Sequence, residues 1–467
     1  MALSRGLSRR RLMTAGTAGT VGAAGALLAA CGGPGAGGSS GGQQTGGQGA
    51  TGGVNGKIIW QAREGQTYRQ LADWAVGEFK KKYPNATVEV SQEATGNFDK
   101  TVTTLVAGTG PDILHGWGRL MVQYAAKGVM FNHNDLVRDL KQADIQDFVK
   151  QQWDGLVVPT TNFRYGVPTY VNIFPLYYNK SLFQKRGQKE PDESWDHTTY
   201  ANAMKALTFE ESGRQVWGGF ANIAIPDRQY HVRAFGGHYV DPKDLTKTQL
   251  GDAPAQQGLQ WLYDRLHTDR SWAPIDGAKR TWQPNSQADG FAQGALATFE
   301  DGAHQIQNVA GKMAQGNEWN IMHMPKGPVA RNTLITTDSW ALWKGTKAKD
   351  TGWAFMQFLL SKEFYAQQSM IEGLIPSRKS VFEQWVNAVK PKLASSSPNF
   401  NFKVIQDAMN QTYPTVDEVF LCQNEAERVM NDALAAVLTR GEKPVSYLRD
   451  VAAQINQAAG SCGAKFS

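Results

Sequence analysis

The segment KIIWQAREGQTYRQLADWAVGEFKKKYPNATVEV (residues 57–90) decides the fold class. Residues 57–60 form a short apolar run, which is typical of a buried strand. Apolar residues then recur at helical spacing over residues 68–79, and alternating apolar residues at 86–90 predict a second strand. A strand, a helix and a strand in this order predict two parallel strands joined by a right-handed crossover. The sequence therefore predicts an α/β fold.

Two classes of function do not fit this segment or the composition of the chain. No glycine-rich phosphate loop follows the first predicted strand, so dinucleotide binding of the usual kind is not expected. The net charge of +6 comes largely from four arginines in the first twelve residues, which leaves the rest of the chain near +2. So small a charge, without a basic stripe, argues against nucleic-acid binding.

Residues 57–467 are long enough for two domains.

The first thirty residues have the composition of an export signal. Residues 1–12 are basic and contain no acid, and residues 13–30 are weakly apolar. A secretory signal peptide has this pattern, whereas a membrane-spanning helix needs roughly 20 strongly apolar residues. The segment SRRRLM (8–13) resembles the twin-arginine export motif, with Leu12 and Met13 in place of the usual Phe and Leu. Both the twin-arginine route and general secretion stay open.

Cys31 follows this apolar run directly. The segment LAAC (28–31) resembles the lipobox of bacterial lipoproteins, in which a peptidase cuts before the cysteine and its thiol carries diacylglycerol. Residues 31–56 contain almost only Gly, Ser, Gln, Thr and Ala, and such a segment lacks the large apolar side chains that offset the entropy of ordering. We expect a lipid on Cys31 and a flexible tether over residues 31–56. The protein would then lie on the outer face of the cell membrane, at the cell surface or in the periplasm.

Two further cysteines, Cys422 and Cys462, complete the total of three. With Cys31 lipidated they form an even pair in an oxidising compartment, and this favours a disulfide between them. Two separate buried thiols are the alternative.

Motifs of catalysis and metal binding are weak. GGSSG (37–41) matches a hydrolase nucleophile pattern, but it lies in the tether rather than between a strand and a helix. The eight histidines show no zinc-ligand spacing, and we expect no metal and no cofactor. Glu210, Glu211 and the acids near Asp301 offer carboxylates for a glycosidase pair, but solvated or capping acids are the more ordinary interpretation.

Aromatic residues are abundant, with fourteen Trp and fourteen Tyr. Most must belong to the core, but Trp117, Trp272, Trp282 and Trp340 stand beside turn signals. An exposed aromatic face suits the apolar C–H face of a sugar ring, and planar polar side chains suit its hydroxyl groups. This composition favours a carbohydrate among small-molecule ligands.

Five separated motifs resemble one protein family and occur in the family's order. They are TGPDI (109–113), YGVP (165–168) with YYNKSLF (177–183), EPDESWD (190–196), FAQGALA (291–297) and GLIPS (373–377). The family is that of the extracellular solute-binding proteins of ABC importers, in the sugar-binding branch that includes maltodextrin-binding protein. Ser194, Ala295 and Thr298 replace residues that are usual in these motifs, which argues against close kinship with any one sugar binder.

The resemblance implies a two-lobed α/β fold of the periplasmic-binding-protein type, with a mostly parallel sheet flanked by helices in each lobe. The chain would cross between the lobes three times, and the ligand would bind in a cleft that closes by hinge motion. The implied boundaries are residues 57–166 and 325–375 for lobe one, residues 167–324 and 376–467 for lobe two, and crossings near 167–172, 323–325 and 375–377.

The family's cleft positions imply eight ligand-binding residues: Arg63, Glu64, Trp117, Tyr170, Asn172, Asp301, His304 and Trp340. Arg63 and Glu64 follow the first strand, and Tyr170 and Asn172 lie at the first crossing. Trp117 stands between two glycines and is the best candidate for stacking on a sugar. The histidine at position 304, where relatives often have an aromatic residue, leaves the second stacking surface open.

The leading hypothesis is therefore a monomeric, membrane-anchored binding protein, not an enzyme, that delivers a small carbohydrate to the permease subunits of an ABC importer. A surface-anchored carbohydrate-active enzyme is the alternative of another class. A third hypothesis keeps the binding fold and changes the ligand, for example to glycerol phosphate or a polyamine.

Overall fold

The computed structural model describes residues 53–91, 97–221, 229–282, 286–464 and 466. The predicted signal, the predicted lipid site at Cys31 and all but the last residues of the predicted tether lie outside the described residues. Within the described part of the chain, no helix is both long enough and apolar enough to cross a membrane.

The opening βαβ unit is confirmed. β1 (Gly56–Gln61) runs parallel to β2 (Ala86–Ser91), and α1 (Gln66–Lys82) connects them. The buried face of α1 consists of Leu71, Ala72, Ala75 and Phe79, as the helical spacing predicted. Side chains at this spacing share one face of a helix, so burying them against the sheet stabilises both elements.

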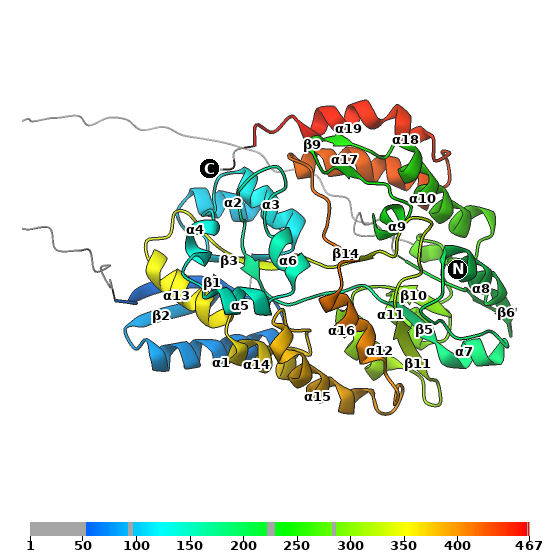
Figure 1. Cartoon of the computed structure of the whole chain (residues 1–467), viewed down its shortest axis with the longest axis horizontal. Helices are drawn as coiled ribbons and strands as arrows, with labels where there is room; N and C mark the ends of the chain where they lie inside the picture. Colours follow the sequence, from blue (N-terminus) through cyan, green and yellow to red (C-terminus); the bar gives the residue numbers. More distant parts are fainter. Residues whose placement is uncertain (1–52, 92–96, 222–228, 283–285, 465, 467) are drawn as a thin grey trace, which may run out of the picture. The chain divides into compact units, whose positions relative to one another are not determined.

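The first sheet has five strands in the order β2-β1-β3-β13-β4, of which Figure 1 labels β1, β2 and β3. Its remaining strands are β3 (Ile113–Gly116), β13 (Ser339–Leu342) and β4 (Val167–Pro168). β1 is parallel to β2 and β3, whereas β13 is antiparallel to both β3 and β4. The chain thus returns to this sheet from the far end of the sequence.

Helices cover both faces of the first sheet because successive side chains of a strand point to opposite faces. Ile113 packs into one hydrophobic core with α1, and its neighbour Leu114 packs into another. The helices on the side of Ile113 include α13 (Lys349–Leu359) and α14 (Lys362–Glu372). The opposite side carries α2 (Phe98–Val106) and α3 (Gly118–Ala126). α4 (Asn134–Val137), α5 (Gln142–Asp147) and α6 (Lys150–Gly155) follow in the chain, and Leu136, Val137 and Trp153 pack into the core that contains Ile113.

The second sheet has the order β10-β5-β11. Its strands are β5 (Leu176–Asn179), β10 (Thr298–Glu300) and β11 (Trp319–Met322). The resemblance implied mostly parallel pairing, but both pairs of these strands are antiparallel. Parallel pairing occurs beside them, in the single bridges Trp217 to Leu296 and Ala221 to Glu300. β5 is the strand that the chain enters directly after the first crossing, and it runs in the direction opposite to both β10 and β11.

Further helices and three short ribbons complete this part of the chain. The helices are α7 (Lys180–Lys185), α8 (His197–Ala206), α9 (Tyr230–Ala234), α10 (Ala253–Tyr263), α11 (Gln287–Ala292), α12 (Ile306–Lys312), α15 (Phe382–Leu393) and α16 (Phe402–Asn410). The ribbons pair β6 (Phe209–Glu211) with β7 (Arg214–Val216), β8 (Val240–Asp241) with β9 (Asp244–Thr248), and β12 (Thr333–Leu334) with β14 (Pro414–Thr415).

Three crossing segments lie side by side between the two sheets. Val171 pairs with Ile375, and Ile173 pairs with Ile335. Residues of the predicted first crossing thus lie beside a residue of the predicted third crossing and beside Ile335. Residues 326–330 bond to the loop before α8 and to the end of α9, and the segment at Ile335 that pairs with the first crossing follows them; we call this segment the second crossing. The lobe boundary near residue 325 stays a prediction.

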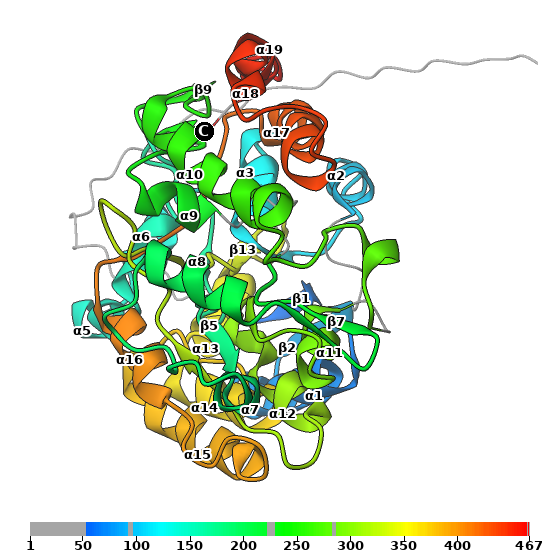
Figure 2. The same ribbon diagram turned by 90° about the vertical axis from the view of Figure 1, so that its right-hand side faces the viewer.

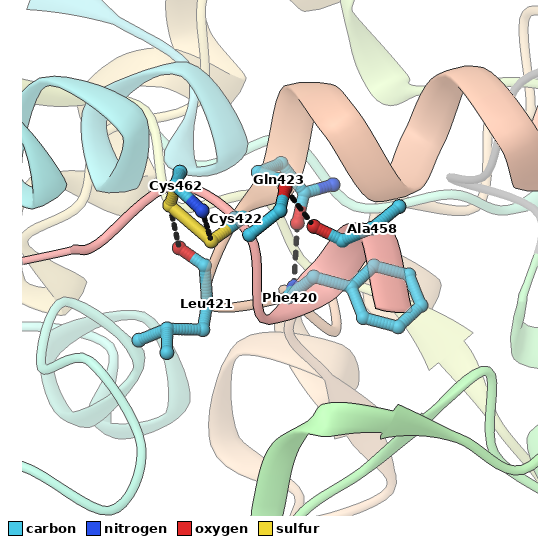
Figure 3. The surroundings of a disulfide bond; sticks show 7 residues. Phe420, Leu421, Cys422, Gln423, Ala458 and Cys462 are labelled. Atoms are coloured by element: carbon cyan, nitrogen blue, oxygen red, sulfur yellow. Dashed lines mark hydrogen bonds between the residues drawn. A yellow bond between two sulfur atoms is a disulfide. The ribbon is translucent and has the colours of Figure 1, made fainter. Parts of the chain in front are cut away.

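The chain ends in α17 (Gln423–Leu434), α18 (Tyr447–Asp450) and α19 (Ala452–Ala459), which we call the C-terminal strap. Cys422 and Cys462 form a disulfide with their Cα atoms 5.5 Å apart (Figure 3). The backbone N–H of Cys422 donates to the Ala459 carbonyl at 3.2 Å. α17 lies against α3 of the first sheet (Figure 1 and Figure 2). An ion pair between Arg119 and Glu427, 3.1 Å apart, joins the two helices.

Candidate ligand-binding site

Four polar or aromatic side chains gather at one edge of the first sheet because of its strand register. Gly116 at the end of β3 pairs with Ser339 at the start of β13, and Ser339 also pairs with Pro168 at the end of β4. The residues just beyond these pairs, Trp117, Asp338 and Tyr170, must therefore leave the sheet at the same edge. Arg63 joins them, because β1 runs parallel to β3 and ends at this edge as well.

Tyr170 contacts both Asp338 and Arg63. The Tyr170 hydroxyl donates a hydrogen bond to Asp338 Oδ1 at 3.0 Å. The Arg63 guanidinium lies over the Tyr170 ring, 4.7 Å from its centre, and over the Tyr68 ring at 4.2 Å. A guanidinium held between two aromatic faces is fixed in orientation, and its remaining N–H groups keep a defined direction.

Burial sets the charge states at this edge. It raises the pKa of Asp338, which the nearby Thr336, Arg63 and Tyr170 counteract only in part. It also raises the pKa of Glu372, at the end of α14, to about 7, again against the charge of Arg63. For Arg63, burial by itself lowers the pKa, but the surrounding tyrosines and carboxylates keep it above its ordinary value. Arg63 is therefore cationic beside two carboxyl groups whose pKa values are raised, and of these Glu372 is only partly ionised near neutral pH.

The second sheet contributes polar residues from the turn after β10. The Asn172 amide lies 3.1 Å from His304 Nδ1, and its Oδ1 accepts from the His304 backbone N–H at 3.2 Å. Asp301 accepts hydrogen bonds from Gly302 at 2.7 Å and from Gln305 at 3.2 Å, and a further one from Gln287. A Cβ at Gly302 would lie 2.4 Å from the Asn172 amide, so glycine permits this close approach.

The two sheet edges meet at the crossing segments. The Thr336 backbone N–H donates to the Asn172 carbonyl at 3.0 Å, which joins the second crossing to the first. His304 is near enough to Asp338 to lower its pKa. We call the set Arg63, Tyr170, Asn172, Asp301, His304 and Asp338 the crossing cluster. It combines a fixed cation, carboxylates, an amide and an aromatic face, which are the groups that hold hydroxyl-rich ligands.

The other predicted site residues differ in exposure. Trp117 is 39% exposed and stands at the start of α3, at the edge that carries Asp338. Glu64 is exposed next to Arg63. Trp340 is only 3% exposed, with its ring edge-on to Trp60 at 5.3 Å and tilted against His115 at 4.7 Å. Trp340 therefore packs in the core of the first sheet and offers no open face to a ligand in this structure.

Sequence reasoning missed Tyr68, His115, Asp338 and Glu372. Asp338 directly precedes the segment that drew attention to Trp340, but the register that brings it to the sheet edge is a property of the fold. His115 is buried in β3, and its two ring nitrogens find no hydrogen-bond partner among the described residues. Burial, followed by the charge of Arg63, lowers the pKa of His115 well below its usual value. It is a neutral neighbour of the cluster.

A known protein family matches most of this chain. Residues 74–395 match the model of a bacterial extracellular solute-binding protein family. The chain belongs to this family. The match includes the second sheet, every strand of the first sheet except β1, and the crossing cluster except Arg63, and it confirms the resemblance seen in the five sequence motifs.

Individual relatives are distant. A binding protein of Brucella abortus is 24% identical over 347 residues, which cover 72% of this chain and 81% of the relative. An ABC substrate-binding protein of Listeria monocytogenes, solved with cycloalternan, has a TM-score of 0.72 at 20% identity and covers 86% of this chain and 99% of its own. The sugar-binding protein MalE of Xanthomonas citri has a TM-score of 0.70 at 17% identity, covering 86% and 97%. These likenesses show the two-lobed fold.

A structure with another kind of ligand is similar too. UgpB of Mycobacterium tuberculosis, in complex with glycerophosphocholine, has a TM-score of 0.66 at 17% identity and covers 87% of this chain and 98% of its own. The fold is thus common to proteins solved with carbohydrates and with a phosphorylated polyol.

Proposed function

We propose that this protein captures a small carbohydrate at the crossing cluster, closes its two lobes on it, and delivers it to the permease subunits of an ABC importer. The observation that carries the proposal is that the two sheet edges meet at this cluster. Side chains from both lobes then contact one ligand, and binding favours the closed arrangement. Two of the similar structures are a cycloalternan complex and a sugar-binding protein, which supports the ligand class.

A ligand panel with one matched pair of variants tests this function. Isothermal titration of the purified chain with mono- and oligosaccharides should find one that binds stoichiometrically. Arg63→Ala should weaken it about 10- to 150-fold, since a hydrogen bond to a charged group contributes about 1.5–3 kcal/mol. Arg186→Ala is the control, because Arg186 also lies over an aromatic ring, 4.6 Å from the centre of Phe209, but outside the cluster. Equal effects of both variants would refute the site.

A phosphorylated polyol is the second candidate ligand. Arg63 offers a fixed cation for a phosphate group, and the UgpB complex shows such a ligand on this fold. Asp338 and Glu372 oppose it, because each carboxylate that stays ionised repels the phosphate. Including glycerol phosphate and glycerophosphocholine in the panel separates the two classes. If purified protein turned over a glycan instead of binding it stoichiometrically, the enzyme hypothesis would replace both.

We also propose that the mature chain is anchored by a lipid on Cys31. The support is the lipobox-like segment that ends at Cys31, followed by a tether without large apolar residues. Intact-mass analysis of protein extracted from membranes should find a lipidated N-terminal cysteine. An unprocessed N-terminus, or a cut elsewhere, would refute the anchor without affecting the ligand site.

A further inference from the structure

A polar pocket lies away from the crossing cluster, beside the end of β11. Its volume is about 560 Å³, and it is bordered by the loop before α8, by the residues that follow β11, and by α16. Glu193, His323 and Asp407 each place a ligand-type atom here, and these atoms all lie within 4.8 Å of one another. From this geometry we propose that Glu193, His323 and Asp407 bind one divalent transition-metal ion, for which Zn²⁺ is the best-matched probe.

The spacing of His323 and Asp407 already fits a shared ion. His323 Nε2 lies 3.5 Å from Asp407 Oδ2. Two ligands of a tetrahedral zinc ion, each about 2.0–2.2 Å from the metal, lie about 3.4 Å apart. The side chain of Glu193 is exposed, so a rotamer change brings its carboxylate to the same point.

His323 is held in the way that a metal ligand requires. Its side chain is buried, and its Nδ1 lies 2.8 Å from the Tyr413 hydroxyl, so a partner on the far side of the ring fixes the orientation of Nε2. Metal-binding histidines commonly have such an outer partner. Imidazole nitrogen with carboxylate oxygens favours zinc over calcium or magnesium.

Three cations near the pocket limit the affinity. Lys403 forms an ion pair with Asp407, one turn away on α16, and Lys326 borders the pocket. Arg331 donates hydrogen bonds at 2.6 Å to the carbonyls of Met324 and Glu193, so it holds the segments that carry His323 and Glu193. We therefore expect micromolar binding, weaker than in a closed four-ligand zinc site.

The ligands come from three segments that are distant in sequence, so a bound ion would tie α16 to the second sheet. The whole chain, without a histidine tag, is stripped with EDTA, dialysed and titrated with Zn²⁺ by calorimetry. We expect one ion per chain and a rise in Tm of a few degrees at saturation. Ca²⁺ and Mg²⁺ at the same concentration should leave Tm unchanged.

Variants distinguish this site from adventitious surface binding. Asp407→Asn and His323→Gln should each weaken Zn²⁺ binding by at least the 10- to 100-fold typical of outer-partner changes. Lys403→Ala should strengthen it severalfold, because the ammonium no longer competes for Asp407. Glu210→Gln, at an exposed acid on β6, is the control and should have no effect. Absence of Zn²⁺ binding, or binding that neither Asp407→Asn nor Lys403→Ala changes, would overturn the proposal.

Discussion

Replacing Trp117 by alanine should remove most of the apolar contact to a bound sugar while leaving the fold intact. The side chain is 39% exposed, whereas a tryptophan covers at most about 250 Å² when fully buried. About 100 Å² is therefore available to a ligand, and covering it contributes about 2.5 kcal/mol at about 25 cal/mol per Å². Trp117→Ala should accordingly weaken binding about 60-fold.

Calorimetric titration and thermal melting of the same preparation test this number. Trp340→Ala is the matched comparison, because that ring is 3% exposed and lies in the core. It should cost about 3–5 kcal/mol of stability and leave the affinity of the folded fraction unchanged. If Trp117→Ala instead lowered stability by that amount and kept its affinity, Trp117 would be a core residue and the stacking argument would fail.

Other expected outcomes concern the disulfide, pH and export. The double variant Cys422→Ser, Cys462→Ser opens a loop with a sequence separation of 40, and urea unfolding should show a loss of about 4 kcal/mol in the chain-entropy model; an unchanged midpoint would contradict this. Burial lowers the pKa of His133 to about 4, and its Nε2 accepts from the Leu342 N–H at 2.8 Å. The unfolded chain takes up this proton below about pH 6.5, so stability should fall by about 3 kcal/mol between pH 6.5 and pH 4. His133→Gln should flatten that part of the pH profile, whereas His304→Gln, at an exposed ring, should keep it. Cys31→Ser should move the protein from the membrane to the soluble fraction or leave it unprocessed, and cell fractionation with immunoblotting shows which.

The secondary structure nearest to the opening segment was predictable because local patterns decide it. The helical spacing of residues 68–79 falls inside α1, and the alternation at 86–90 falls inside β2. Strand direction in the second sheet was not predictable in this way. It depends on where the chain enters after a crossing, and no local pattern encodes that.

The candidate site shows the same division. Arg63, Tyr170, Asn172, Asp301 and His304 could be placed near the sheet edges because they follow strands or crossings in recognisable motifs, and their role in binding a ligand stays a prediction. At positions 338 and 340 the sequence was misleading. A tryptophan beside a turn suggested that the Trp340 ring is exposed, and no pattern singled out Asp338. In the fold, Trp340 pairs with His115 of a central strand and faces inward, while Asp338 is the residue that reaches the edge. The register between these strands depends on pairing between distant parts of the chain, and local sequence patterns do not predict it.

The C-terminal strap affects how easily the lobes separate. Hydrogen bonds between side chains and backbone tie it to the second lobe, as from the Thr248 backbone N–H to Asn456 Oδ1 at 2.7 Å, and Leu421, just before it in the chain, donates to the Leu245 carbonyl at 2.9 Å. Its ion pair with the first lobe joins Arg119 and Glu427. Because these hydrogen bonds hold the strap to the second lobe, we expect it to travel with that lobe and to leave α3 when the protein opens. Each opening must then rehydrate a partly buried ion pair. Release of the ligand then includes a free-energy barrier from separating Arg119 and Glu427, which lie far from the ligand. Salt lowers this barrier because it screens the ion pair.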